Sequence, residues 1–130
     1  MAYKYYNPNG NKKHTGDCVV RAISKLMDQT WDQTYIELCL QGFLMKDFGD
    51  SNQVWNSYLR GRGFKRYAIS NTCPDCYTVR DFCYDHSIGE YLLATGSHVV
   101  AVIEGDYYDS WNSGDEVPIY YYSRQNNERR

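Results

Sequence analysis

Hydrophobic side chains recur at steps of three and four residues through the first half of the chain, and this spacing predicts amphipathic helices. The first helix is expected to begin at Cys18, with Asp17 as its N-cap residue. A second helix is expected after Thr30, because Gln33 follows at the spacing of a capping box. The apolar positions of the first helix are Val19, Ala22, Ile23, Leu26 and Met27. One face of the second helix carries Trp31, Tyr35, Leu38 and Cys39.

The pattern also predicts a third helix, which begins after Ser51 and ends at Gly61 or Gly63. Its apolar positions are Val54, Trp55, Tyr58 and Leu59. Residues 1–16 are polar and contain the turn sequence Asn7-Pro8-Asn9-Gly10. We therefore expect them to form an irregular lead-in to the first helix.

The second half of the chain has shorter apolar runs that are typical of strands. The expected strands span residues 64–69, 91–95, 98–103, 107–111 and 117–122. The turn Glu104-Gly105-Asp106 joins two of them in a hairpin, Thr78 with Asp81 opens a short helix, and residues 123–130 are expected to fray. Helices followed by a meander of strands predict one α+β domain over residues 1–130, with N-terminal helices packed on an antiparallel sheet.

The composition is that of a folded domain. Hydrophobic residues make up 42% and aromatic residues 16% of the 130 residues, which is enough for one core. The net charge of -2 gives no electrostatic footprint for nucleic acid or an anionic membrane, so neither is expected as a partner. The N-terminus has no apolar h-region, which predicts a cytoplasmic protein. Five cysteines in such a chain indicate reduced thiols, metal ligands or catalysis rather than a disulfide framework.

Cys18 is a candidate nucleophile because of its expected place at a helix start. Cysteine attacks carbonyl groups as the thiolate, so it needs surroundings that lower its pKa. The free N–H groups and the dipole at a helix start favour negative charge, and the same N–H groups can receive an oxyanion. Taken alone, Cys18 is explained more simply as a small buried hydrophobe.

His98 opens the most apolar of the predicted strands, directly after three small residues. If the hairpin turns at Glu104-Gly105, His98 lies opposite Trp111, and Asp109 lies one step along on the same face. A carboxylate there can accept the Nδ1–H of His98, which orients the ring and stabilises its protonated form, while Trp111 shields the contact from water. Asn112 has the opposite parity and is the alternative orienting residue if the strand has already ended.

Three stretches of the sequence resemble papain-like cysteine peptidases. The run His98-Val-Val-Ala-Val-Ile and the segment Asp109-Ser110-Trp111 are similar to the histidine strand and the Asn-Ser-Trp segment of that family. Gly16-Asp17-Cys18-Val-Val-Arg-Ala-Ile is similar to the segment in which the family's nucleophile opens the central helix. The length and the aspartate are closer to the bacteriocin-processing (double-glycine) peptidases and to small bacterial and phage proteins of that general type.

The resemblance implies a papain-like fold and a thiol-dependent hydrolase that cleaves a peptide or isopeptide bond. Cys18 would be the nucleophile, His98 the base and Asp109 the residue that orients the base. The implied partner is a peptide or protein substrate, and no cofactor is implied. An acyl transferase, with an amine in place of water, would use the same residues.

Two features depart from that family. Papain-like enzymes usually place a glutamine several residues before the nucleophile to bind the oxyanion, and residues 1–17 contain none. Asn11 is expected to take that place. Asp17, next to the nucleophile, opposes thiolate formation unless its side chain turns away to cap the helix. Both features favour the alternative of a non-catalytic binding or inhibitor protein on the same fold.

Cys73, Cys76, Cys83 and His86 form a C-x2-C-x6-C-x2-H pattern, which supplies the four ligand types of a tetrahedral zinc site. A structural zinc at these residues is a second hypothesis and would make the protein a small zinc-stabilised adaptor. Burial explains Cys83 equally well, because it lies on the apolar face of its short helix. His86, at the end of that helix, can bond the last carbonyl groups instead.

Overall fold

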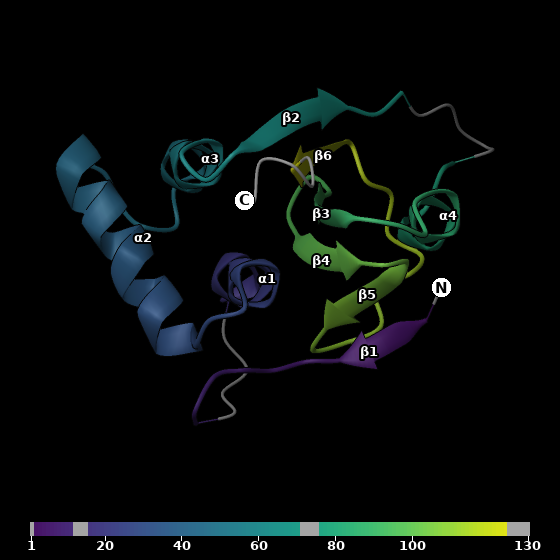
Figure 1. Cartoon of the computed structure of the whole chain (residues 1–130), viewed down its shortest axis with the longest axis horizontal. Coiled ribbons are helices and arrows are strands. Elements are labelled where there is room, and N and C mark those ends of the chain that lie inside the picture. The colour runs from purple at the N-terminus through teal and green to yellow at the C-terminus, as the bar shows by residue number, and fades with distance from the viewer. Residues whose placement is uncertain (1, 12–15, 71–75, 125–130) are drawn as a thin grey trace.

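The computed structural model describes residues 2–11, 16–70 and 76–124, which contain four helices and six strands (Figure 1). The helices are α1 (Cys18–Met27), α2 (Trp31–Met45), α3 (Asn52–Arg60) and α4 (Val79–Asp85). The strands are β1 (Tyr3–Tyr5), β2 (Phe64–Ala68), β3 (Glu90–Ala94), β4 (Val99–Ile103), β5 (Asp106–Asp109) and β6 (Tyr120–Arg124). The predicted α+β class is confirmed. None of the described helices is both long enough and apolar enough to cross a membrane.

Two helices begin with the side-chain caps that the sequence indicated. The Thr30 hydroxyl accepts a hydrogen bond from the Gln33 N–H at 3.0 Å at the start of α2. At α4 the capping box is reciprocal: Thr78 accepts from the Asp81 N–H at 3.2 Å, and the Asp81 carboxylate accepts from the Thr78 N–H at 3.0 Å. These bonds satisfy donors that a helix start leaves free, so α4 can form within a short segment.

The six described strands form one sheet in the order β1-β5-β4-β3-β6-β2. Neighbouring strands are antiparallel except that β1 pairs with β5 in parallel, so the sheet is mixed and the prediction of an antiparallel sheet was wrong at this edge. Residues 1–16, expected to be irregular, therefore contain an edge strand at Tyr3–Tyr5. Three residues are too few to show a two-residue period in the sequence. At the other end, β6 continues to Arg124, beyond the predicted strand end at Tyr122.

Helices cover both faces of the sheet, with α1, α2 and α3 on one face and α4 on the other (Figure 1). Because side chains alternate along a strand, β3 and β4 contribute to both cores. The core under α1–α3 includes Leu92, Ala94, Val99 and Ala101, and the core under α4 includes Leu93, Val100 and Val102. At the start of β4, Val99 lies beside Cys18 at the start of α1.

Helix α2 packs on the rest of the protein along a narrow stripe. The buried residues of α2 are Thr34, Leu38 and Gly42. At Gly42 the helix approaches the following loop so closely that a Cβ atom would lie 2.6 Å from the Asp47 carbonyl oxygen. Because α2 packs through Thr34, Leu38 and Gly42, Tyr35 and Cys39 are exposed. The sequence had predicted that these two residues share an apolar face with Leu38. The outward side of α2 also carries the exposed side chains of Ile36, Leu40, Phe43 and Leu44.

Candidate active site

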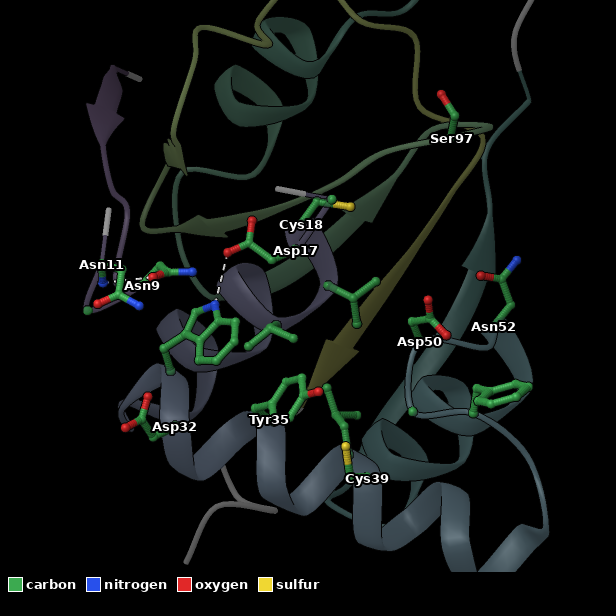
Figure 2. Close-up of a pocket in the computed structure, with 18 residues that line it drawn as sticks. Asn9, Asn11, Asp17, Cys18, Asp32, Tyr35, Cys39, Asp50, Asn52 and Ser97 are labelled. Atoms are coloured by element: carbon green, nitrogen blue, oxygen red, sulfur yellow. Dashed lines mark hydrogen bonds between the residues drawn. The ribbon is translucent and has the colours of Figure 1, made fainter. Parts of the chain in front are cut away.

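Cys18 is the first residue of α1, and its half-buried side chain lines an open cleft of about 890 Å³ (Figure 2). The thiol therefore lies in the first helical turn, as predicted, beside N–H groups that have no helical carbonyl partner. The other described residues that line the cleft are Asn9, Gly10, Asn11, Gly16, Asp17, Val19, Val20, Trp31, Asp32, Tyr35, Leu38, Cys39, Phe48, Gly49, Asp50, Asn52 and Ser97. A cleft of this volume is within the usual range of ligand sites.

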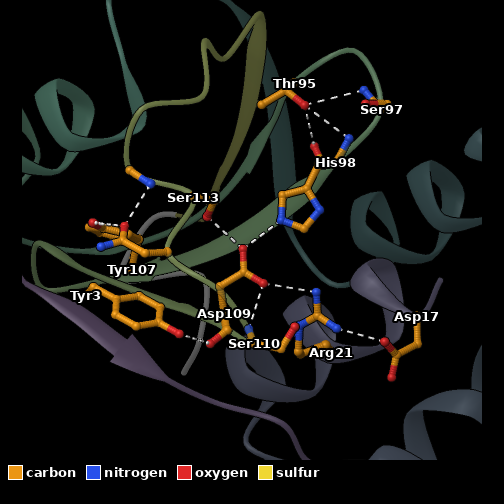
Figure 3. Close-up of polar contacts among 12 residues, drawn as sticks. Tyr3, Asp17, Arg21, Thr95, Ser97, His98, Tyr107, Asp109, Ser110 and Ser113 are labelled. Carbon is orange, nitrogen blue, oxygen red and sulfur yellow. Dashed lines mark hydrogen bonds and ion pairs between the residues drawn. The ribbon is translucent and has the colours of Figure 1, made fainter. Parts of the chain in front are cut away.

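His98 lies directly before β4, and a tight turn with Thr95 fixes its backbone. The Thr95 N–H donates to the His98 carbonyl at 2.8 Å, and the Thr95 hydroxyl accepts from the His98 N–H at 3.0 Å (Figure 3). From this position the ring lies close enough to the Cys18 thiol for each group to shift the pKa of the other. Gly96, within the turn, has no atom within 4 Å of its Cβ position, so the turn itself is open there.

Strands β4 and β5 pair in the register expected from a turn at Glu104-Gly105. Both turn residues have positive φ, 51° and 80°, as the twist of a two-residue hairpin requires. Extended beyond the paired residues, this register sets His98 level with Trp111, and Asp109, the last residue of β5, follows one step along. The Asp109 carboxylate is fully buried, and its Oδ2 lies 2.6 Å from His98 Nε2.

The ring nitrogen that meets Asp109 is not the predicted one. The sequence argument assigned Nδ1 of His98 to the carboxylate, but the contact is made by Nε2. Nδ1 is therefore the ring nitrogen that is left for the Cys18 thiol. Parity along a strand gives the face on which a side chain lies, but it does not say which edge of an imidazole reaches a neighbour.

The Asp109 carboxylate accepts four hydrogen bonds from described residues, two on each oxygen (Figure 3). Besides His98, Oδ2 accepts from the Ser113 hydroxyl at 2.6 Å. Oδ1 accepts from the Ser110 N–H at 2.8 Å and from Arg21 Nη2 at 3.0 Å. A buried carboxylate bonded in this way is held both ionised and in a fixed orientation. Ser113 and Arg21 were not identified from the sequence.

The Asp17 side chain does not cap α1, which corrects the role expected for it. Its Oδ1 accepts a hydrogen bond from Arg21 Nη1 at 2.7 Å, and its Oδ2 accepts one from Trp31 Nε1 at 2.9 Å. Arg21 thus bridges Asp17 and Asp109, and all three are buried. The i,i+4 spacing of Asp17 and Arg21 on the predicted helix is the signal that could have indicated this pair.

These contacts favour an ion pair between thiol and ring. Burial raises the pKa of the Cys18 thiol, but hydrogen bonds from His98 and the Val99 N–H, with the charges of His98 and Arg21, outweigh burial and bring the pKa below its ordinary value. Burial also lowers the pKa of His98, whereas hydrogen bonds and charge interactions with Asp109 and Cys18 raise it to about 9. Between these two pKa values the thiolate–imidazolium pair is the stable form.

Trp111 lies against the His98 ring, with a centroid separation of 4.9 Å, as expected for a residue that shields the site. Asn112, the alternative orienting residue, is engaged elsewhere: its Oδ1 accepts hydrogen bonds from the Tyr107 hydroxyl at 2.7 Å and from the Gly114 N–H at 3.1 Å. Asn112 therefore does not orient His98, although β5 ends at Asp109, before Asn112.

Asn11 lines the cleft but lies away from the nucleophile. Its N–H donates to Asn9 Oδ1 at 2.8 Å. Figure 2 shows Asn9 and Asn11 on the far side of Asp17 from the Cys18 sulfur. The oxyanion role of Asn11 stays a prediction that its position does not support. The N–H groups at the start of α1 are the nearer donors.

The predicted zinc site has no ligand set within the described part of the chain, where no three His, Cys, Asp or Glu side chains are arranged to hold a metal. Cys73 lies outside the described residues, and Cys76 is disulfide-bonded, unlike the expected reduced thiols. The Cys83 thiol is fully buried under α4, and burial raises its pKa to about 12. His86 Nδ1 lies 3.0 Å from the Phe82 carbonyl oxygen, and the two rings stack. Cys83 and His86 thus have the packing roles that were the alternative to zinc.

Comparisons of the chain with protein-family models, with curated proteins and with solved structures found no match. No family is therefore assigned, and the function of the cleft has to be inferred from its own geometry. That geometry joins a thiol at a helix start, an imidazole at a strand start and a buried carboxylate on the next strand.

Proposed function

We propose that this protein is a papain-like cysteine hydrolase that cleaves a peptide or isopeptide bond with a Cys18–His98–Asp109 triad. The observation that carries the proposal is the coupling of thiol, imidazole and carboxylate. Interaction with His98 lowers the pKa of the Cys18 thiol, and His98 Nε2 lies 2.6 Å from Asp109 Oδ2. Three such groups, brought together from distant segments beside an open cleft, support an active site better than a structural cluster.

In the proposed reaction the Cys18 thiolate attacks the carbonyl carbon of the substrate amide, and the carbonyl π electrons move to the oxygen. As the tetrahedral intermediate collapses, the His98 imidazolium gives its proton to the leaving amine and the C–N bond breaks, which leaves a thioester and a neutral ring. His98 then takes a proton from water while the water oxygen attacks the thioester. The Cys18 thiolate leaves with the bonding electrons, and the ion pair is restored.

We assign the oxyanion to the start of α1. The backbone N–H groups of Cys18 and Val19 lie in the first turn, where no helical carbonyl can bond them, and both residues line the cleft. The helix dipole adds to their attraction for developing negative charge. Asp109 keeps the imidazole oriented in both steps.

The proposed papain-like fold rests on the order of the parts. The nucleophile opens a helix that packs on the sheet, and the histidine and the aspartate follow on two adjacent strands. The sequence resemblance has the same order. The parallel edge strand β1 extends the sheet beside β5, and the Tyr3 hydroxyl donates to the Asp109 carbonyl at 3.2 Å.

A non-catalytic binding or inhibitor protein is the second candidate. It is favoured by the position of Asn11, which lies away from Cys18 although it was the amide expected to bind the oxyanion (Figure 2). An acyl transferase would share every triad residue with the hydrolase and differ only in the acceptor of the acyl group.

Iodoacetamide labelling tests the triad. Near pH 6 an ordinary thiol is less than about 1% ionised and reacts slowly. We expect Cys18 to be alkylated about a hundredfold faster than Cys39, a free and exposed thiol of the same protein, as measured by peptide mass spectrometry. The His98→Ala variant should lose this difference. Equally slow labelling of both thiols in the wild type would reject the triad.

Turnover distinguishes the two candidates. With p-nitrophenyl acetate, the hydrolase is expected to release nitrophenol repeatedly through an acetylated Cys18 that intact-mass spectrometry detects. Cys18→Ser should abolish both signals. Fast alkylation of Cys18 with no ester turnover would favour the binding protein.

A further inference from the structure

Arg21 connects the triad to a second buried carboxylate. Its side chain is 7% exposed, and its guanidinium donates from Nη1 to Asp17 at 2.7 Å and from Nη2 to Asp109 at 3.0 Å. The reaction steps above use neither Arg21 nor Asp17. Burying three charged groups costs free energy unless each is well bonded, so the cluster requires a physical reason.

The charges around Cys18 balance only when Arg21 is present. Asp17 and Asp109 are negative and the His98 imidazolium is positive, so Arg21 supplies the second positive charge. The cluster is then neutral before Cys18 ionises. Without the guanidinium, the thiolate would form beside two carboxylates that share a single cation, and like charges at short range oppose ionisation.

Arg21 also determines which oxygen of Asp109 faces the imidazole. The guanidinium and the Ser110 N–H both bond Oδ1, which leaves Oδ2 turned toward His98 (Figure 3). A rotation of the Asp109 carboxylate would break bonds to both oxygens. The planar guanidinium suits this task because it presents donors in fixed directions.

Asp17 fixes Arg21 from the other side. Its carboxylate bonds Arg21 through Oδ1 and the Trp31 indole N–H through Oδ2, and Trp31 belongs to the wall of the cleft (Figure 2). A negative charge next to Cys18 would by itself oppose the thiolate. Because Arg21 neutralises it, Asp17 can anchor the network without that penalty.

We propose that Arg21, anchored by Asp17, is a positioning residue of the triad, which keeps Asp109 ionised and turned toward His98 and so maintains the reactive form of Cys18. Arg21 has this role only if the triad is the working site proposed above.

The titratable groups that face Arg21 or its two partners are Asp17 and Cys18 at the start of α1, His98 before β4, Asp109 of β5 and Tyr3 of β1. Burial raises the pKa of Tyr3 above its ordinary value near 10, so Tyr3 stays neutral throughout the acid pH range. A change in the acid range after removal of Arg21 therefore reports on the other four groups.

The test measures the alkylation rate of Cys18 against pH in Arg21→Met, Arg21→Lys and Arg62→Met. We expect the acid limb of the Arg21→Met profile to move up by about one pH unit, so that the rate near pH 6 falls about tenfold. Arg21→Lys keeps a positive charge and is expected to recover part of that loss. Arg62 pairs with Glu37 of α2 at 3.5 Å, so Arg62→Met is the matched control and is expected to keep the wild-type profile.

Circular dichroism establishes that each variant is folded. If Arg21→Met does not fold, Arg21→Gln, which keeps N–H donors but no charge, gives the same readout. A folded Arg21→Met or Arg21→Gln with the wild-type profile would overturn the role of Arg21 and leave the triad intact. A wild-type protein in which Cys18 reacts no faster than Cys39 would instead reject the proposed function itself.

Discussion

Helices α1 and α4, which lie on opposite faces of the sheet, each carry one cysteine, and the two thiols have opposite properties. Cys18 lies half-buried at the start of α1, and its interaction with His98 helps to bring its pKa below the ordinary value. Cys83 lies fully buried in the apolar core under α4, and burial raises its pKa to about 12. Burial opposes the thiolate at both places. The partners of Cys18 therefore make the difference, because they lower the pKa of its thiol despite burial.

The two histidines beside these cysteines differ in the same way. His98 meets the buried Asp109 carboxylate, whereas His86 bonds the Phe82 carbonyl at 3.0 Å and stacks on the Phe82 ring. A backbone carbonyl accepts a hydrogen bond but carries no net charge to stabilise an imidazolium. The comparison teaches that an ionised partner raises the pKa of an imidazole in a way that a neutral carbonyl group cannot, and only His98 has such a partner.

Removing each histidine in turn is expected to give the largest contrast. His98→Ala should slow the alkylation of Cys18 near pH 6 about a hundredfold, because the thiolate loses its imidazolium. His86→Ala should leave that rate unchanged and lower the free energy of unfolding by about 1–2 kcal/mol, through the lost ring stacking and hydrogen bond. Peptide mass spectrometry and urea denaturation measure the two effects. Equal slowing by both variants would mean that the two histidines do not differ as described.

Replacing the carboxylate is expected to have the next largest effect. Asp109→Asn keeps the size of the side chain but cannot stabilise an imidazolium by charge, so Cys18 alkylation near pH 6 should fall at least about tenfold. Asn112→Ala is the matched control, because Asn112 bonds Tyr107 and Gly114 instead of the ring. A comparable loss in Asn112→Ala would return the orienting role to Asn112.

The pH dependence of stability isolates His98 once the thiol is removed. The folded pKa of His98, about 9 with Cys18 present, is raised above the unfolded value, so its stabilising contribution is complete below about pH 6.5 and is lost as pH rises toward the folded pKa. Over that range the free energy of unfolding of Cys18→Ser should fall by about 1–2 kcal/mol relative to Cys18→Ser/His98→Gln. Urea denaturation at several pH values measures it. Parallel curves for the two variants would show that the fold does not stabilise the imidazolium.

The smallest effect is expected at Asn11. Because Asn11 lies beyond Asp17 from the Cys18 sulfur, Asn11→Ala should change ester turnover by less than about twofold (Figure 2). Nitrophenol release under saturating ester provides the measurement. A loss of tenfold or more, with Cys18 alkylation unchanged, would support the oxyanion role that the sequence suggested.

Local signals in the sequence predicted much of the fold and the three candidate residues Cys18, His98 and Asp109. Capping residues and helical spacing located the four helices, and the glycine turn at Glu104-Gly105 set the register that brings Asp109 to His98. The expected helix start at Cys18 indicated a candidate nucleophile only in combination with His98 and Asp109 on the predicted hairpin. These features depend on neighbours within a few residues or across one hairpin.

What the sequence did not reveal depends on contacts between distant segments. The strand at Tyr3–Tyr5 forms through its parallel pairing with β5. Its three residues are too few to show the two-residue alternation of polar and apolar side chains by which a strand is predicted. The bond from Arg21 to Asp109 spans 88 positions, and the ring nitrogen that faces Asp109 depends on how α1 packs against β4. The exposed side of α2 likewise follows from the close approach at Gly42. Such features require the packing of the whole chain.

The thiolate of Cys18 can be observed directly by its ultraviolet absorbance, taken as the difference between wild type and Cys18→Ser through a pH titration. An ordinary thiol ionises near pH 8.5, so its thiolate band disappears on the acid side of that value. The charge network described here predicts a thiolate band that titrates below pH 8.5, and that titrates at higher pH in the His98→Ala background. A titration of Cys18 at or above the ordinary value in the wild type would contradict the ion pair on which the proposed hydrolase depends.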